Sequence, residues 1–352
     1  MMNHKEPNKA LYGVPFVAND FNGMPYRSLG SSGLKVSNIG LGTWKFGFPE
    51  TGDGARTNEK ASFEILDRAI ELGVTFWDTA NRYNNASGNS ERIIGRWFKK
   101  NDSQRRNVVL GTKICGGMDG RTPNHSGLSR GNIIDSVSAC LDRLETNYID
   151  LLYFHNSDAT VPPEESLATI EDLVSKGTVR YFAVSNFTPG QLANFQRVEN
   201  KLSIRCRVAA VENQFDILNG EGNKHAGALE FAKQNGISFI AWSPLARGLL
   251  TNRYLDPSKA KAGDRLFDEG TINNDLNEKT SKKLRQLSDL AISWNIELNH
   301  LALAYMLTLP GMGPVIPASS TVTQLESNAI AGKIKLSEEQ QKQIKTILKD
   351  IN

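Results

Sequence analysis

A regular alternation of helix-like and strand-like segments constrains the fold of this chain more than any other feature of its sequence. Segments whose apolar residues recur at helical spacing lead, one after another, into short runs rich in β-branched and aromatic residues, which are typical of buried strands. The expected helices span residues 59–72, 92–100, 133–144, 165–175, 191–199, 226–234 and 299–309. The strands expected after them span residues 74–79, 108–113, 149–156, 179–186, 208–214, 237–244 and 313–320.

Such an alternation predicts an α/β protein with a parallel sheet and right-handed crossovers. Together with the run that ends in Gly42, Thr43 and Trp44, eight strands are expected, the number that closes a (β/α)8 TIM barrel. The preceding stretch, "MPYRSLGSSGLKVSNIG" (residues 24–40), contains two extended runs around a Gly/Ser turn. We expect this N-terminal β-hairpin to close the bottom of the barrel. The rival fold, an open doubly wound sheet, is disfavoured because no G-x-G-x-x-G turn follows the first strand.

The composition is that of a globular domain. Of 352 residues, 39% are hydrophobic and 22% are charged, and we expect a single domain over residues 21–352 after an N-terminal tail, residues 1–20. The net charge is only +3, which argues against nucleic acid as a partner. No apolar run approaches the roughly 20 residues of a membrane span, and no signal pattern is present, so a cytoplasmic protein is expected. The three cysteines lack metal-type spacing, and no metal site is expected.

Polar residues stand at the ends of the predicted strands. Asp78 ends one apolar run, although an aspartate is seldom buried without a partner. Each such residue alone is usually a turn former or a helix cap, but in a barrel the strand ends meet at the active site. Neighbouring strands lie about 5 Å apart, so we expect Asp78, Lys113 and His155 to be neighbours. The other strand ends carry Ser185, Asn186, Glu212, Asn213, Trp242 and Ser243.

Tyr83, in the loop after Asp78, completes a set of groups suited to proton transfer. A tyrosine has a reference pKa of about 10, and a lysine ammonium within hydrogen-bonding reach lowers it. Asp78 would hold Lys113 in place, and His155 would orient a substrate oxygen. The set therefore predicts protonation of an oxygen as a carbonyl becomes an alkoxide.

At these residues the chain resembles the aldo-keto reductases, from about Met24 to Asn328. The stretch "FWDTANRYNNASGNSERIIGRWFK" is similar to that family's "DTA…YG.G.SE…G..L" signature, "LGTKICG" to its lysine strand, "SVSACLDRLETNYIDLLYFHNSD" to its histidine strand and "VRYFAVSNF" to its "G.SNF" strand. The resemblance implies a barrel that binds NADP(H) in extended form without a Rossmann fold. It also implies a metal-free catalytic tetrad in which Tyr83 is the general acid/base and the cofactor passes hydride to the substrate carbonyl. Its members are Asp78, Tyr83, Lys113 and His155.

The same resemblance implies a set of cofactor-binding residues. Ser185 and Asn186 would hydrogen-bond the nicotinamide carboxamide, and Trp242, unless it is an ordinary core tryptophan, would lie against the nicotinamide ring. The remaining expected contacts are Gly42, Thr43 and Trp44 at the first strand end, Ser243, Leu245 and Gly248 at the pyrophosphate, Arg253 and Arg265 at phosphates, and Ser319, Gln324 and Asn328 at the adenosine.

Glu212 departs from the family pattern, which usually has glutamine at this position. A carboxylate beside the nicotinamide would favour the positively charged oxidised ring over the neutral reduced ring. Under this hypothesis turnover includes alcohol dehydrogenation. The alternative is a carboxylate that only hydrogen-bonds the carboxamide amine or a ribose.

A second departure concerns the adenosine end of the cofactor. The stretch "IPASST" lacks the lysine or arginine that many members of the family direct at the 2′-phosphate. Arg253 and Arg265 would take over, since arginine suits phosphate geometry. NADP(H) is therefore the preferred cofactor, and NAD(H) use stays open. Residues 253–278 are either a lid over the cofactor or a solvated connection.

Two function classes remain. The first is an oxidoreductase acting on a small-molecule carbonyl or alcohol substrate, such as an aldehyde, a ketone or a sugar. The second is a cofactor-binding regulatory subunit with little turnover, because some aldo-keto reductase relatives attach to ion channels. Residues 115–132 would overhang the pocket, which makes Arg121, Asn124 and His125 candidate substrate contacts. The natural substrate, the direction of the reaction and the oligomeric state stay open.

Overall fold

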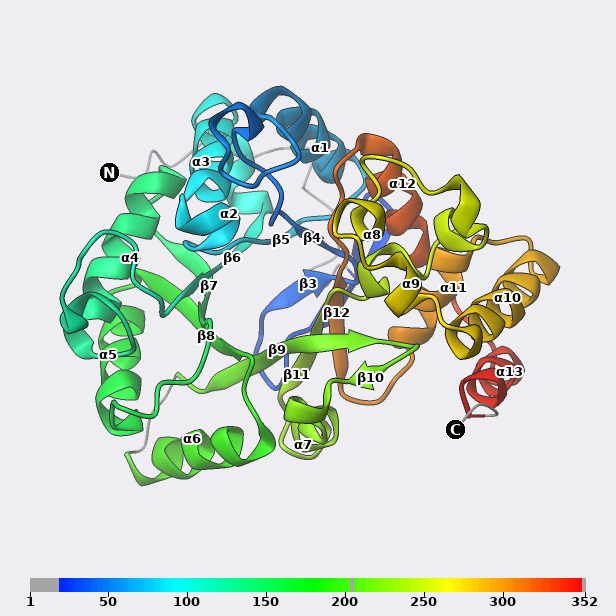
Figure 1. Cartoon of the computed structure of the whole chain (residues 1–352). Coiled ribbons are helices and arrows are strands. Elements are labelled where there is room, and N and C mark those ends of the chain that lie inside the picture. The colour runs from blue at the N-terminus through cyan, green and yellow to red at the C-terminus, as the bar shows by residue number, and fades with distance from the viewer. Residues whose placement is uncertain (1–18, 203–205, 350–352) are drawn as a thin grey trace, which may run out of the picture.

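The computed structural model describes residues 19–202 and 206–349, so residues 1–18 of the predicted tail lie outside the described part. Eight parallel strands form a nearly closed barrel with helices around its outside (Figure 1), which confirms the predicted (β/α)8 architecture. The barrel strands are β4 (Gly40–Gly42), β5 (Phe76–Asp78), β6 (Val109–Ile114), β7 (Ile149–Phe154), β8 (Val179–Ser185), β9 (Val208–Asp216), β11 (Ser238–Trp242) and β12 (Met312–Ile316).

The barrel strands follow one another in chain order from β4 to β12, and each neighbouring pair is parallel. Between β12 and β4 the ring closes through isolated parallel bridges that join Ile39 to Val315 and Gly42 to Ala318. The Val315 amide also donates a hydrogen bond of 3.2 Å to the carbonyl oxygen of Asn38. Because every strand runs in the same direction, all eight carboxyl ends meet at one end of the barrel, where active sites of this fold lie.

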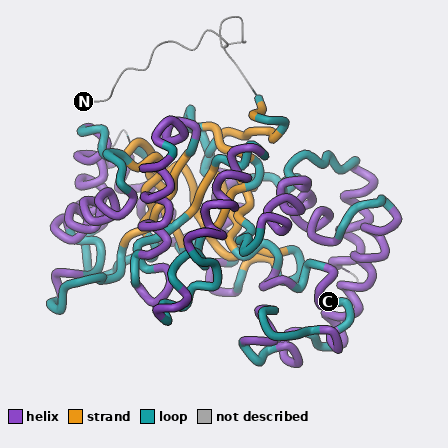
Figure 2. Tube along the Cα trace, turned by 90° about the horizontal axis from the view of Figure 1, so that it is seen from above, coloured by secondary structure: helices purple, strands orange, loops and turns teal. Residues whose placement is uncertain are grey.

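Helices enclose the strands on the outside, as a view turned by 90° shows (Figure 2). A short strand, β10 (Gly220–Glu221), pairs antiparallel with the end of β9. Within the described residues, no helix has the length and apolarity that crossing a membrane requires. The helices are α1 (Glu59–Glu71), α2 (Tyr83–Ala86), α3 (Asn89–Lys100), α4 (Arg130–Leu144), α5 (Pro163–Ser175), α6 (Pro189–Lys201), α7 (Ala228–Gln234), α8 (Arg265–Asp268), α9 (Ile272–Asp275), α10 (Glu278–Ser293), α11 (Leu298–Met306), α12 (Val322–Ala331) and α13 (Glu338–Lys349).

The predicted helix starts were wrong where the first turn is polar. Helices α3 and α4 begin at Asn89 and Arg130, three residues before the apolar periodicity becomes visible. The Ser129 side chain accepts a hydrogen bond from the Asn132 amide, so capping starts α4 although its first turn carries few apolar residues. Helices α10, α12 and α13 were not predicted, because none of them leads directly into a barrel strand.

The N-terminal segment forms a small antiparallel sheet of β1 (Asp20–Phe21), β2 (Met24–Ser28) and β3 (Lys35–Ser37). Its turn lies at the amino ends of β11 and β12. The Gly30 amide donates to the Ser238 hydroxyl at 2.6 Å, and the Arg27 guanidinium donates to the Met312 carbonyl oxygen at 2.9 Å. In Figure 1, β3 lies within the ring of barrel strands. The predicted hairpin therefore closes the end of the barrel opposite to the strand tips.

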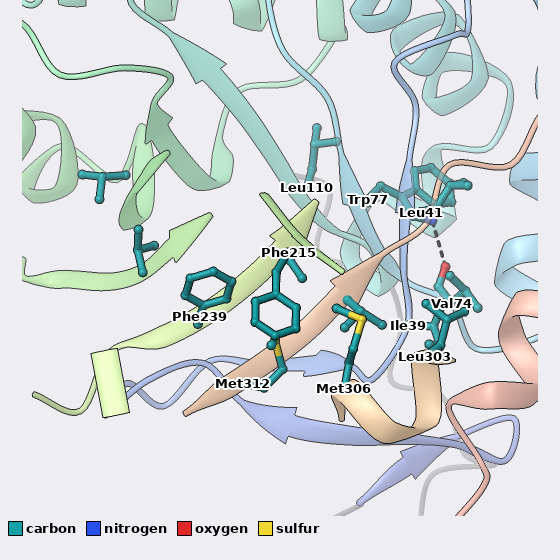
Figure 3. Close-up of a cluster of buried hydrophobic side chains, with 14 of the residues drawn as sticks. Ile39, Leu41, Val74, Trp77, Leu110, Phe215, Phe239, Leu303, Met306 and Met312 are labelled. Carbon is teal, nitrogen blue, oxygen red and sulfur yellow. Dashed lines mark hydrogen bonds between the residues drawn. The ribbon is translucent and has the colours of Figure 1, made fainter. Parts of the chain in front are cut away.

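Two hydrophobic cores lie on the two faces of the barrel wall. The interior core combines Leu29 and Val36 of the hairpin with inward-facing residues such as Phe76, Leu151 and Ile240. The larger core fills the space between the strands and the surrounding helices. Figure 3 shows part of it, where the indole nitrogen of Trp77 donates to the carbonyl oxygen of Val74 at 2.9 Å.

Two glycines that follow helices test how tightly the N-terminal sheet is held. Gly73 after α1 and Gly177 after α5 have nearly the same positive φ, +73° and +74°. Alanine at Gly177 meets no atom within 4 Å, so Gly177→Ala should cost only the left-handed backbone strain of about 1–2 kcal/mol. A Cβ at Gly73 would lie 2.0 Å from the carbonyl oxygen of Phe21. We therefore expect Gly73→Ala to lower the midpoint of thermal unfolding clearly further than Gly177→Ala, and equal losses would contradict this packing of β1.

Candidate active site

Strand alternation brings the polar strand-end residues into the barrel interior. On each strand every second side chain faces inward, and the inward positions below the site are apolar or small, for example Tyr153 on β7 and Ala210 on β9. Two residues further along the same faces come His155 and Glu212. Asp78 and Lys113 are inward residues of β5 and β6 by the same alternation. The strands therefore deliver these four side chains to one place.

Lys113 is the centre of this site. Its ammonium donates to Asp78 Oδ1 at 2.6 Å, to the Tyr83 hydroxyl at 2.9 Å and to the Thr79 carbonyl oxygen at 3.1 Å. The Tyr83 hydroxyl in turn donates to Asp78 Oδ2 at 3.1 Å. The side chains of Lys113 and Asp78 are only 1% and 3% exposed, so their charges are shielded from solvent. The structure therefore brings Asp78, Tyr83 and Lys113 into direct contact, as the sequence suggested.

The local backbone around Tyr83 depends on asparagine. Asn84 and Asn85 follow Tyr83 with φ of +54° and +57°, a conformation that asparagine tolerates better than most residues. The Asn84 side chain donates to the carbonyl oxygen of Phe46 at 2.6 Å, which fixes this turn against the loop after β4. The sequence "RYNNAS" thus folds into a short irregular turn that holds the phenol over Lys113.

The charges around Lys113 set its protonation and that of Tyr83. Burial acts to lower the pKa of Lys113, but the negative charge of Asp78, and that of Glu212 when it is ionised, outweigh burial. The pKa of Lys113 is raised, so Lys113 is positive at neutral pH. Burial raises the pKa of Tyr83, and the charge of Asp78 adds to this effect. Lys113 acts to lower the pKa of Tyr83, as expected from the sequence, but the net pKa of Tyr83 is above its ordinary value. The phenol therefore keeps its proton in this state.

His155 lies beside Tyr83 as a neutral ring. The two ring centroids are 6.1 Å apart and the rings are edge-on at 75°. Burial lowers the pKa of His155 to about 3, and the positive charges of Lys113 and Arg82 act in the same direction. At neutral pH the His155 imidazole therefore carries a single N–H. That N–H is a donor suited to an uncharged oxygen placed beside the phenol.

Glu212 is a second carboxylate in contact with Lys113. Its Oε1 lies 3.4 Å from the ammonium nitrogen, and its Oε2 is buried without a hydrogen-bond partner in the described part of the chain. The hydroxyl of Tyr153, on the strand residue paired with Lys113, is likewise buried and without a partner there. Burial raises the pKa of Glu212 to about 8, and the negative charge of Asp78 acts in the same direction. At neutral pH Glu212 therefore holds a proton for most of the time.

Two candidate carboxamide ligands lie at the end of β8. The Ser185 hydroxyl donates to the carbonyl oxygen of Glu212 at 2.9 Å. Asn186 has a φ of +60°, and its side-chain nitrogen Nδ2 donates to the carbonyl oxygen of His155 at 2.9 Å. These bonds connect the ends of β7, β8 and β9, and they place Ser185 and Asn186 directly between His155 and Glu212.

Trp242 is the last residue of β11, and Ser243, Leu245 and Gly248 follow in one irregular segment. All four are partly buried, and Ser243 has a φ of +57°. Gly248 has a φ of +101°, and a Cβ there would lie 3.2 Å from the Tyr254 ring. The segment therefore stays close to the barrel mouth and keeps partly accessible surface there, as a strap along a ligand requires.

The arginines expected at phosphates are paired with acidic residues. Arg253 lies 3.1 Å from Asp264, and Arg265 lies 2.8 Å from Glu269. The Arg265 guanidinium also lies over the Trp44 ring at 4.9 Å from its centroid. These contacts connect residues 253–278 to the loop after β4, so this segment is not a freely solvated connection.

The remaining candidates are mostly occupied by protein contacts. Thr43 is buried and donates to the Asp78 carbonyl oxygen at 2.9 Å, and Gly42 forms a parallel bridge with Ala318, just after β12. Asn328 donates to Ser319 at 3.3 Å, and Gln324 accepts from the Ser320 amide at 2.8 Å. The side chains of Thr43, Ser319 and Asn328 thus shape the backbone around the mouth.

The sequence analysis missed three residues at this site. Tyr153 could have been found from strand alternation, because it stands two residues before His155 on the inward face of β7. Asn81 is fully buried, and neither side-chain polar atom has a partner in the described part. Arg82 is exposed next to Tyr83, and its only sequence signal is that adjacency.

A cavity lies at the opposite end of the barrel from the tetrad. It has a volume of about 710 Å³ and is lined by Ser31–Gly33 and by residues at the amino ends of β8 and β9, including Arg180 and Val208. This is the opposite end of the strands from Tyr83. Among the described residues, no group of three or more His, Cys, Asp or Glu side chains is placed to hold a metal ion.

Comparison with known proteins agrees with the geometry. The model of the aldo/keto reductase family matches residues 38–349. Aldo-keto reductase AMT2 of Alternaria alternata is 32% identical over 342 residues, which cover 91% of this chain and 90% of the relative. Versiconal hemiacetal acetate reductase of Aspergillus parasiticus is 30% identical and covers 90% of this chain and 95% of the relative. A probable voltage-gated potassium channel subunit beta of Arabidopsis thaliana is also 30% identical, over 87% of this chain and 90% of the relative.

The family match spans the whole barrel, and the relatives align along nearly their full length. The chain belongs to the aldo/keto reductase family.

Proposed function

We propose that this protein is an NADP(H)-dependent oxidoreductase that transfers hydride between nicotinamide and a small carbonyl or alcohol, with Tyr83 as general acid/base. The observation that carries the proposal is the contact of the buried Lys113 ammonium with both the Tyr83 hydroxyl, at 2.9 Å, and Asp78. An ammonium in this place stabilises the phenolate that forms when Tyr83 gives its proton away. We expect the protein to act in the cytoplasm, where cysteines without disulfides such as Cys115 are typical.

The residues around the strand ends fit a bound dinucleotide. Ser185 and Asn186 would hold the carboxamide, partly exposed Trp242 would lie against the nicotinamide, and the segment after Trp242 would follow the pyrophosphate. The unpartnered Oε2 of Glu212 is a buried polar atom that a ligand group at this site can satisfy. When bound, NADP(H) supplies or accepts the hydride.

Proton transfer can be assigned to groups of the chain itself. The Tyr83 hydroxyl accepts a hydrogen bond from Lys113 and donates one to Asp78 at 3.1 Å. A substrate oxygen beside Tyr83 would replace Asp78 as the acceptor of that proton. The neutral His155 ring would donate a second hydrogen bond to the same oxygen, because its low pKa prevents it from acting as an acid at neutral pH. His155 thus orients the oxygen and Tyr83 protonates it.

The alternative is a cofactor-binding regulatory subunit with little turnover. It is suggested by the relative named as a potassium channel beta subunit. The hydrogen-bonded Asp78, Lys113 and Tyr83 favour an enzyme, since binding a cofactor alone does not require a phenol held against a buried ammonium. Turnover that depends on the Tyr83 hydroxyl separates the two functions.

Removal of that hydroxyl is the first test. We expect Tyr83→Phe to lower kcat for reduction of aldehydes by about 10²- to 10⁴-fold, the usual contribution of a general acid, while NADPH binding stays unchanged. Tyr305→Phe is the matched control, because it removes a phenol hydroxyl on α11, away from the strand ends, and should retain activity. Steady-state NADPH oxidation with a panel of aldehydes, ketones and sugars provides the measurement. Turnover by the wild type no higher than by Tyr83→Phe would favour the regulatory subunit.

Glu212 predicts a pH dependence of cofactor choice. Its pKa of about 8 means that it holds a proton below pH 8 and is negatively charged above it. The positive charge of the oxidised nicotinamide would stabilise the charged carboxylate and lower this pKa in the complex. The affinity for NADP⁺ relative to NADPH should therefore rise as the pH increases from about 6 to about 8, by about tenfold for each unit of that pKa change, and level off above pH 8.

The Glu212→Gln variant isolates this effect. We expect its ratio of dissociation constants for NADP⁺ and NADPH to be independent of pH over the same range, as measured by fluorescence titration. Because the 2′-phosphate is common to both cofactors, its own titration cancels in the ratio. An unchanged pH dependence in the variant would show that Glu212 only hydrogen-bonds an amide or a ribose.

Cofactor preference can be tested at the paired arginines. A phosphate must compete with Asp264 for Arg253 and with Glu269 for Arg265. We expect NADPH to bind more tightly than NADH, and Arg265→Gln to weaken NADPH binding by about tenfold, the value of a charge-assisted hydrogen bond, with little effect on NADH. Arg106→Gln, an exposed change before β6, is the control. A tighter complex with NADH would overturn the preference.

A further inference from the structure

Arg82 occupies a defined position at the mouth of the site. It directly precedes Tyr83, and its guanidinium donates to the carbonyl oxygen of Gly117, in the loop that follows β6. A Cβ on Gly116 would lie 2.4 Å from Arg82 Cδ and 2.9 Å from its Nε. The arginine side chain therefore packs closely against Gly116, three residues after Lys113, and a side chain at position 116 would displace it from this place.

Among the residues that the structure describes, the guanidinium of Arg82 has no carboxylate partner. No acidic residue in the described part of the chain lies within ion-pair distance of it, although Arg253, Arg265 and Arg247 at the same end of the barrel are all paired. The carboxylate of Asp158 instead accepts hydrogen bonds from the backbone amides of Leu128 and Thr160. A guanidinium has five N–H donors, and the bond to Gly117 is the only hydrogen bond it makes to a described residue.

The positive charge of Arg82 affects the pKa of residues near the strand ends. It is one of the causes that lower the pKa of His155, after burial and Lys113, and it also acts to lower the pKa of Cys115 at the end of β6. Arg82 is thus close to the ring that would orient the substrate oxygen, and it is exposed to solvent at the entrance. An anionic group of a ligand can reach it without being buried first.

We propose that Arg82 is a specificity-determining residue that binds a carboxylate at the far end of the substrate, so that the preferred substrates are aldehyde or keto acids. The proposal rests on the proposed oxidoreductase function. The planar fork of a guanidinium matches a carboxylate in two parallel hydrogen bonds. The close packing of Arg82 against Gly116 and its hydrogen bond to Gly117 hold that fork in place.

Two substrates of nearly the same shape test the role of charge. 4-Carboxybenzaldehyde and 4-nitrobenzaldehyde both carry a planar group with two oxygens, but only the first is an anion. We expect Arg82→Gln to lower kcat/KM for 4-carboxybenzaldehyde by at least about tenfold, mainly through KM, as the loss of a charge-assisted hydrogen bond predicts. The change for 4-nitrobenzaldehyde should be less than about twofold, and Arg106→Gln, with the same change in net charge, should affect neither substrate.

Equal losses on both substrates would show that Arg82 only supports the loop through Gly117. No loss on either substrate would show that Arg82 does not contact substrate. Either result overturns the proposal.

The proposed function can be judged separately. Turnover of 4-nitrobenzaldehyde that Tyr83→Phe abolishes would sustain the proposed function even if the proposal for Arg82 fails. If the wild type turns over neither aldehyde, the proposed function fails, and calorimetric binding of benzoate to the NADPH-saturated protein decides separately on Arg82. Benzoate should bind at least about tenfold more weakly to Arg82→Gln than to the wild type, and equal binding would overturn the proposal.

Discussion

The buried ion pair of Lys113 and Asp78 is the interaction on which the rest of the site depends. Removing two charges from water is costly and is compensated only when the geometry is good and the remaining donors are satisfied. Here the Lys113 ammonium donates to the Tyr83 hydroxyl and the Thr79 carbonyl oxygen as well as to Asp78. This arrangement requires that β5 and β6 pair in the correct register. The strand pairing that builds the barrel therefore also determines where the Tyr83 hydroxyl lies.

A second consequence follows from the number of carboxylates around one ammonium. If Asp78 and Glu212 were both ionised beside Lys113, the site would bury a net negative charge, which a low-dielectric interior disfavours. Retention of a proton on Glu212 relieves this excess, and a positively charged ligand would relieve it as well. Protonation and binding of an oxidised nicotinamide are therefore alternative ways to neutralise the same cluster.

The barrel mouth divides into a part that the strands fix and a part that the loops fix. Asp78, Lys113 and His155 follow from strand geometry and need no loop to meet. Arg82 and Arg265 instead depend on contacts between loops, with Gly117 in one case and Trp44 in the other. The rigid strands thus position the proposed catalytic residues, whereas the more variable loops position the residues proposed to select the ligand, as is common in barrels.

The sequence by itself determined the (β/α)8 fold, because helix and strand periods are local properties. It also predicted that Asp78, Lys113 and His155 would meet, because strands of known order end side by side. It did not reveal that the pKa of Tyr83 is raised despite Lys113, since burial and the summed field of two carboxylates exist only in the folded chain. Nor did it show that Arg253 and Arg265 pair with acidic residues, whereas Arg82 has no such partner in the described part of the chain. Only the tertiary structure decided these points, because partners distant in sequence determine which charges are neutralised.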